Sequence, residues 1–191
     1  MMMKTFLFYL RNIRGIAAIE MAFIMPFLLF LYFGLVDLTS MISINRKLTY
    51  SASVVADLVT QNDTNVTTTN IADYVNAAAM IMKPTPIANV RVEVYLFRKN
   101  TSTNVISRIW YYKTAAGPTC SATQPSTTGM DTLMTDGNDL VVSRVCYTYS
   151  PYVATFLGKK VLGATSFLMS EQIALRPRQS TTLACATCPT T

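Results

Sequence analysis

Residues 16–36 read IAAIEMAFIMPFLLFLYFGLV and contain a single charged side chain, Glu20. As a helix these residues extend about 31 Å, which matches the roughly 30 Å hydrocarbon core of a bilayer. The apolar core of a cleavable secretory signal is shorter, at ~7–15 residues, and no small-x-small cleavage site follows closely here. We therefore expect a transmembrane helix over residues 16–36 that stays attached to the chain.

Basic residues are distributed unevenly around this helix. Lys4, Arg11 and Arg14 precede it, whereas the first cations after it are Arg46 and Lys47. Short segments rich in Lys and Arg tend to remain in the cytoplasm. We expect residues 1–15 to be cytoplasmic and everything after the helix to lie outside the membrane.

Placing Glu20 in a membrane helix is energetically unfavourable, because a carboxylate in hydrocarbon needs a positive partner. The segment from Arg14 to Glu20, RGIAAIE, resembles the processing site of type IV prepilins. The resemblance implies cleavage after Gly15 by a membrane peptidase, so that Ile16 becomes the new N-terminus and Glu20 the fifth residue. The new amine of one subunit would then attract Glu20 of a neighbour strongly in the low-dielectric bilayer.

Beyond the membrane the helical pattern continues and becomes amphipathic. A mainly apolar stripe at three- and four-residue steps predicts one helix as far as residue 58 or 59; it comprises Leu38, Met41, Asn45, Leu48, Ala52, Val55 and Val59. A second helix is expected over residues 71–82, capped by Asn70 and ended by Pro84. Its buried face would consist of Ile71, Val75, Ala78 and Met82.

The apolar period then changes to two, which is typical of strands. We predict strands over residues 89–99, 105–112, 139–149 and 166–176, with Val90, Val92, Val94 and Leu96 on one face of the first. Residues 114–138 are mostly Thr, Ser, Gly and Pro, and we expect them to form a surface excursion. The order of elements predicts an α+β fold, an antiparallel sheet with helices on one face.

A long N-terminal helix followed by a small α+β domain resembles pilins, and TadE-like proteins match best. The helix exit at residues 56–61 (ADLVTQ), the segment YTYSPY at residues 147–152 and RPR at residues 176–178 also resemble that family. Met21 departs from the tyrosine usual in major pilins of the Tad system, which favours a minor subunit. The expected organisation is a leader at 1–15, a transmembrane helix at 16–36, a stalk helix at 37–60 and an outer domain at 61–191.

Four cysteines lie beyond the membrane helix, where an oxidising compartment favours disulfides. We prefer to pair Cys120 with Cys146 and Cys185 with Cys188, among three possible pairings. The Cys185-x-x-Cys188 spacing also fits a thiol–disulfide active site, which needs a helix or cations to lower the pKa of a thiol. Pro189 and two threonines follow, so we favour a structural disulfide.

Composition argues against several functions. The chain has no histidine, which excludes histidine-based triads and most zinc sites, and no metal or other cofactor is expected. The net charge of +6 is dispersed, so we expect no nucleic-acid binding. Ser and Thr lack an evident activating base, and we expect no enzymatic activity.

The prediction is therefore a minor pseudopilin in the bacterial inner membrane, which assembles into or at the base of a Tad-type pilus or secretion apparatus and supports adhesion. The resemblance implies its partners: a prepilin peptidase, the pilin, other minor pseudopilins and the Tad inner-membrane platform. The alternative is an unprocessed single-pass protein whose outer domain binds a ligand. That alternative predicts no cut after Gly15 and no role for Glu20.

Overall fold

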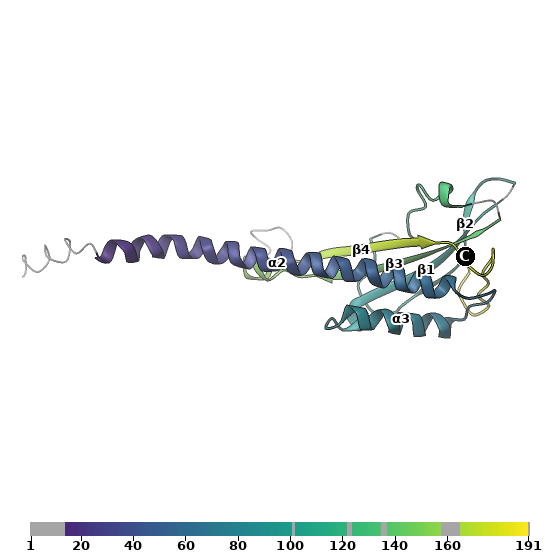
Figure 1. Cartoon of the computed structure of the whole chain (residues 1–191), viewed down its shortest axis with the longest axis horizontal. Helices are drawn as coiled ribbons and strands as arrows, with labels where there is room; N and C mark the ends of the chain where they lie inside the picture. The colour runs from purple at the N-terminus through teal and green to yellow at the C-terminus, as the bar shows by residue number, and fades with distance from the viewer. Residues whose placement is uncertain (1–13, 101, 122–123, 135–136, 158–164, 191) are drawn as a thin grey trace, which may run out of the picture. The chain divides into compact units, whose positions relative to one another are not determined.

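The computed structural model describes residues 14–100, 102–121, 124–134, 137–157 and 165–190 (Figure 1). The chain divides into two compact units. The first unit comprises Met1–Ser40 and Pro151–Thr165, and the second comprises Met41–Ser150 and Ser166–Thr191. The first helix, α2 (Arg14–Thr60), begins in the first unit and ends in the second.

Helix α2 is continuous through Pro26 and Gly34. Within a membrane a helix satisfies its own backbone hydrogen bonds, and single Pro or Gly residues are tolerated. The predicted stripe is buried from Leu48 onward, at Leu48, Ala52, Val55 and Val59. Leu38 and Met41, earlier in the same stripe, are exposed. The apolar pattern is thus continuous, but only its second half contributes to a protein core.

Helix α3 (Thr68–Met82) begins earlier than the sequence indicates. Its N-cap is Thr67, whose side chain accepts a hydrogen bond from the Asn70 backbone N–H, while the Asn70 side chain accepts one from the Thr67 N–H. This reciprocal capping box shows that the cap assigned to Asn70 was wrong. The predicted buried face is confirmed: Ile71, Val75, Ala78 and Met82 are all buried.

Four antiparallel strands form one sheet in the order β2-β1-β3-β4. Their bounds are β1 (Val90–Lys99), β2 (Ile106–Lys113), β3 (Asp139–Tyr149) and β4 (Phe167–Leu175). All four lie within two residues of the predicted ranges. A short helix, α4 (Tyr152–Leu157), follows β3 and was not predicted. The expected α+β, pilin-like layout is confirmed.

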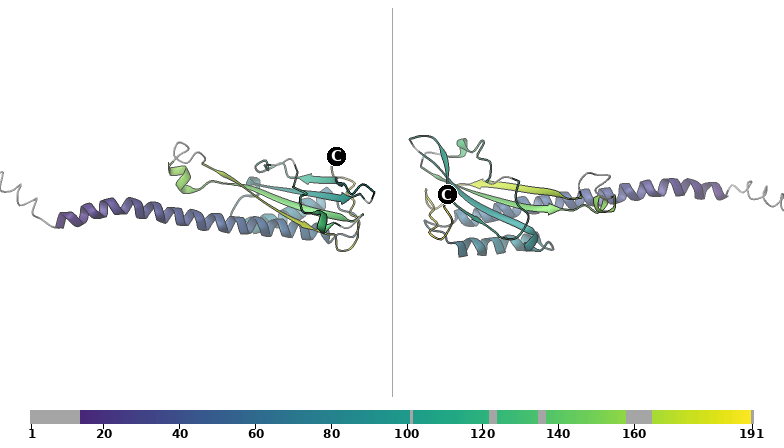
Figure 2. Two further views of the ribbon diagram at one scale, coloured as in Figure 1. Left: turned by 90° about the horizontal axis from the view of Figure 1, so that it is seen from above. Right: turned by 180° about the vertical axis from the view of Figure 1, so that it is seen from behind.

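Helix α3 and the second half of α2 cover one face of the sheet (Figures 1 and 2). The four β1 residues predicted to share a face, Val90, Val92, Val94 and Leu96, all lie in this core. Alternate residues of a strand point to opposite faces, so the intervening β1 side chains face the other side of the sheet. This helix-covered core is the main apolar core of the second unit.

Residues of the long 114–138 segment pack against the opposite face. Met130 and Met134 are buried there with Tyr95 and Phe97 of β1, and Leu140 and Val142 of β3 complete the cluster. The expectation of a simple surface excursion was therefore incomplete, because two methionines of this polar segment pack against the sheet. The sequence gives little indication that these methionines are buried, because isolated apolar residues form no periodic pattern.

Candidate functional site

The first half of α2 presents an apolar surface that nothing in the described structure covers. Every residue from 16 to 33 is exposed, and Phe23 is 80% exposed. Soluble domains rarely leave a continuous apolar surface of this size in water. The helix is long and apolar enough to cross a membrane, so a single-pass N-terminal anchor accounts for it.

Gly15, Ile16 and Glu20 lie in the first turns of α2. Glu20 is exposed and follows Ile16 by four residues, which is about one helical turn. Its carboxylate therefore lies on the bare apolar part of the helix, near the end that would be shallow in a bilayer. Residues 1–13 of the leader predicted at residues 1–15 lie outside the described residues.

Asp37 directly follows the apolar stretch and holds α4. Its Oδ1 accepts a hydrogen bond from the Tyr152 backbone N–H at 2.9 Å, and its Oδ2 accepts one from the Val153 N–H at 2.7 Å. The residue is only 7% exposed. A carboxylate that satisfies the first N–H groups of a helix stabilises the helix start and is itself stabilised by the helix dipole.

Asp37 is not among the residues that the sequence pattern marks as functional. Its partner Tyr152 lies 115 residues away along the chain. One local signal was available, because Pro151 precedes α4 and proline is common at helix starts. Nothing in the sequence indicates that Asp37 is the residue that caps this helix.

The end of α2 contacts the segment that follows β4. Arg178 of RPR forms an ion pair with Asp57 of the helix exit, with Nη2 and Oδ1 2.6 Å apart. The Arg178 backbone N–H donates to the Thr60 carbonyl at 3.0 Å. The guanidinium is 62% exposed, so the ion pair alone contributes at most about 1 kcal/mol. Its structural role is to place the segment after β4 beside the end of α2.

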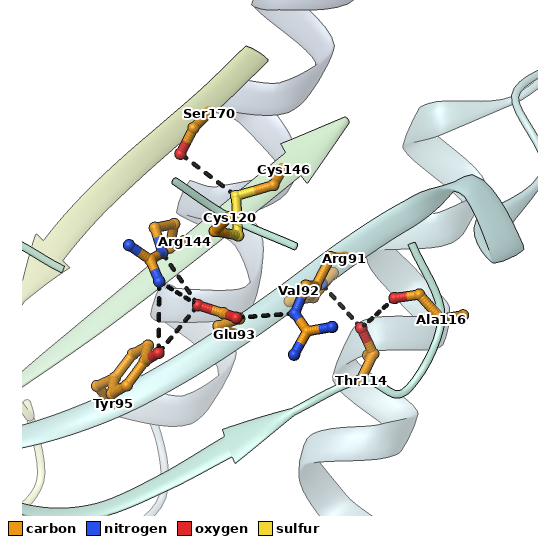
Figure 3. The surroundings of a disulfide bond; sticks show 10 residues. All are labelled: Arg91, Val92, Glu93, Tyr95, Thr114, Ala116, Cys120, Arg144, Cys146 and Ser170. Carbon is orange, nitrogen blue, oxygen red and sulfur yellow. Dashed lines mark hydrogen bonds and ion pairs between the residues drawn. A yellow bond between two sulfur atoms is a disulfide. The ribbon is translucent and has the colours of Figure 1, made fainter. Parts of the chain in front are cut away.

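A buried polar cluster lies on the loop-covered face of the sheet (Figure 3). Glu93, only 2% exposed, accepts hydrogen bonds from Arg91 Nε at 2.8 Å, Arg144 Nε at 3.0 Å and the Tyr95 hydroxyl at 2.9 Å. Burial raises the pKa of Glu93, but these three hydrogen bonds together outweigh it and hold the pKa below its ordinary value. The carboxylate is therefore charged, and both of its oxygens are hydrogen-bonded within the fold.

Cys120 and Cys146 form a disulfide beside this cluster, with Cα atoms 5.8 Å apart (Figure 3). Cys146 belongs to β3 and Cys120 to the 114–138 segment, so the bond ties that segment to the sheet. In the chain-entropy description, closing a loop of this length stabilises the fold by roughly 3–4 kcal/mol. The pairing is the one preferred from the sequence.

Cys185 and Cys188 form the second disulfide, and both residues are less than 10% exposed, at 8% and 7%. The surrounding tail is held at several points: the Trp110 indole donates to the Leu183 carbonyl at 3.2 Å, and the Thr187 hydroxyl accepts from the Thr68 N–H at 2.9 Å. Both sulfurs belong to the helix-covered core. This burial favours a structural disulfide, because exchange chemistry requires an accessible sulfur.

No group of three or more potential metal ligands occurs among the described residues. One hollow on the surface of the second unit is lined by Ala88, Asn89, Gly117, Pro118 and Thr148, none of which has an ionisable side chain. The features that stand out are instead the bare apolar helix with Glu20 and the Asp37 junction at its end. Such features suit membrane anchoring and helix packing.

The model of the TadE-like protein family matches residues 15–57. The match begins at Gly15, spans the apolar stretch with Glu20, and ends at Asp57 of the helix exit. It confirms the TadE-like resemblance over this part of the chain. No curated protein and no solved structure gives a significant match.

Proposed function

We propose that this TadE-like chain is a minor pseudopilin of a Tad-type pilus or secretion apparatus. One observation carries the proposal: the TadE-like match coincides with the bare apolar helix on which Glu20 follows Ile16 by one turn. The family match supports a role related to Tad systems, and the exposed helix supports a single-pass membrane anchor.

In this proposal a prepilin peptidase cuts between Gly15 and Ile16 and leaves an ammonium at Ile16. Glu20 is one turn away, and in a staggered assembly the ammonium of an incoming subunit meets Glu20 of its neighbour. A misplaced subunit would leave a charge unpaired in hydrocarbon, so the pair specifies axial register more than affinity. Assembly would then involve the pilin, companion minor pseudopilins and the inner-membrane platform.

The outer domain would act as a structural and binding module without catalytic activity, placed outside the inner membrane. The buried second disulfide and the fully paired Glu93 support this view, because neither is available to a substrate. Adhesion would be the output of the assembled apparatus.

The first experiment determines the N-terminus of the membrane-bound protein in a host that has its own prepilin peptidase. Intact mass and N-terminal sequencing are expected to show a chain that starts at Ile16, and Gly15→Leu should abolish the cut. A wild-type chain that retains its leader contradicts processing. It would favour an unprocessed anchored binding domain.

The second experiment separates cleavage from assembly. Glu20→Gln keeps the shape of the side chain but removes its charge, and Glu20→Asp keeps the charge. We expect Glu20→Gln to be inserted and cleaved but to be absent from the assembled apparatus. Glu20→Asp should be incorporated into the apparatus in part. Normal incorporation of Glu20→Gln, measured by immunoblot of sheared fibres and membranes, contradicts the pairing of Glu20 with the amine.

A further inference from the structure

The junction between Asp37 and α4 points to a second membrane contact. We propose that α4 is an interfacial element that holds Tyr152 among the lipid headgroups at the outer end of the α2 anchor. The inference rests on the proposed membrane anchoring, although it does not depend on cleavage at Gly15.

The depth of Asp37 follows from the helix itself. Asp37 lies 21 residues after Ile16 on one continuous helix. At 1.5 Å per residue this is about 31 Å, so a hydrocarbon core of roughly 30 Å that begins near Ile16 ends beside Asp37. Asp37 therefore lies where hydrocarbon gives way to headgroups.

The two hydrogen bonds from α4 to Asp37 hold Tyr152 at the same depth in the membrane as Asp37. The Tyr152 N–H donates directly to Asp37, so the Tyr152 backbone lies within hydrogen-bonding distance of a residue at the boundary. The Tyr152 side chain is 71% exposed, whereas Asp37 is buried. The tyrosine ring is thus free to contact the surroundings at this level.

The surface around the junction is apolar and exposed, as expected for contact with lipid. On α2, the apolar side chains of Leu35 and Leu38, on either side of Asp37, are exposed, and so is Tyr32 one turn earlier. Tyrosine is enriched at membrane–water interfaces because its ring is apolar and its hydroxyl polar. We therefore assign the exposed ring of Tyr152 to the outer boundary.

The arrangement also lowers the cost of placing a helix start at the interface. Free N–H groups at a helix N-terminus are unfavourable away from water, but Asp37 accepts from two of them. Conversely, these charge-assisted bonds reduce the need of the Asp37 carboxylate for water. The exposed Tyr152 is held at the level where the anchor ends, so we assign its surroundings to lipid.

The test uses the full chain reconstituted in phosphatidylcholine vesicles, with tryptophan as a probe. Tyr152→Trp adds one indole to the buried Trp110 of the outer domain. Lipids with bromines near the headgroup end of the acyl chains should reduce the added emission, and lipids with deep bromines should reduce it less. The parent chain reports any quenching of Trp110 and also shows whether the domain is folded.

Tyr50→Trp is the matched control. Tyr50 is also exposed, at 61%, but it lies 13 residues beyond Asp37 on α2, or about 20 Å further along the helix axis. We expect its added emission to be insensitive to brominated lipid. Asp37→Ala combined with Tyr152→Trp should lose the quenching while Trp110 emission is unchanged, because α4 is released.

The outcomes are distinguishable. Added emission of Tyr152→Trp that is no more quenched than that of Tyr50→Trp overturns the interfacial contact, provided that the chain floats with the vesicles. Failure to float overturns the membrane anchoring as well. Quenching that persists after Asp37→Ala contradicts the role of Asp37 in holding α4.

Discussion

At the scale of single residues, Gly117 lies in surroundings that leave no room for a side chain. Its φ is +87°, and a Cβ at this position would lie 2.4 Å from the Arg91 backbone nitrogen. The close approach brings the start of the 114–138 segment against β1, where the Thr114 hydroxyl accepts from the Val92 N–H at 3.0 Å. A side chain at this position would therefore push the segment away from the strand.

We expect Gly117→Ala to lower the free energy of unfolding by about 2–5 kcal/mol, the sum of a left-handed backbone and an overpacked contact. Gly129→Ala is the control, because Gly129 has a similar φ of +80° but open space where a Cβ would lie. It should cost only about 1–2 kcal/mol. Urea unfolding of the detergent-solubilised chain measures both; equal losses would contradict the close contact.

Glu93 gives a prediction on pH. Because its pKa in the fold lies below the ordinary value of 4.5, its charge stabilises the fold above about pH 4.5. That contribution is lost as the pH falls through the lowered pKa. We expect Glu93→Gln to lose about 3 kcal/mol at neutral pH, because Arg144 then loses its buried anionic partner.

The difference between wild type and Glu93→Gln should shrink as the pH falls from 4.5 through the lowered pKa of Glu93, because the wild-type carboxylate becomes protonated over that range. Chemical unfolding of both chains at a series of pH values gives the two curves. A constant gap between wild type and Glu93→Gln would contradict the lowered pKa.

At the scale of elements, α3 depends on its capping box. Thr67→Ala removes the hydroxyl that accepts from the Asn70 N–H and should cost about 1 kcal/mol. Thr69→Ala, at an exposed site two residues later, should change stability by less than about 0.5 kcal/mol. Equal effects of the two substitutions in urea unfolding would show that the cap does not limit the helix.

The elements were also the most predictable part of the fold. The helices and strands follow from the local spacing of apolar residues. Apolar residues three or four positions apart line one face of a helix, and apolar residues two positions apart line one face of a strand. The start of α3 was misplaced because Thr67 and Asn70 are both good caps, and the choice depends on their mutual hydrogen bonds. Helix α4 was missed because six residues are too few to show a period.

At the scale of the whole molecule, the position of the anchor predicts the topology. A C-terminal fusion to alkaline phosphatase, which is active only outside the cytoplasm, should be active. The same fusion lacking residues 1–36 should be inactive, because its anchor is removed. An inactive fusion to the full chain, combined with bright fluorescence of a C-terminal green fluorescent protein, would reverse the predicted orientation.

Among the candidate site residues, Gly15, Ile16 and Glu20 could be chosen from the sequence because their signal is local. The length, apolarity and single charge of residues 16–36 require no knowledge of the rest of the chain. The cysteine pairs were harder, since four cysteines allow three pairings. Cys120 and Cys146 lie 26 residues apart, and only the fold shows that the 114–138 segment returns to β3.

The sequence by itself determined the apolar anchor helix, the order of the longer helices and the strands, and the faces that α3 and β1 bury, because these depend on neighbours within a few residues. The tertiary structure decided that Asp37 caps α4, that Asp57 pairs with Arg178, and that Met130 and Met134 fasten a polar segment to the sheet. These contacts join residues that are distant along the chain. A single polar or apolar side chain has many possible partners of that kind, and only folding brings one of them within reach.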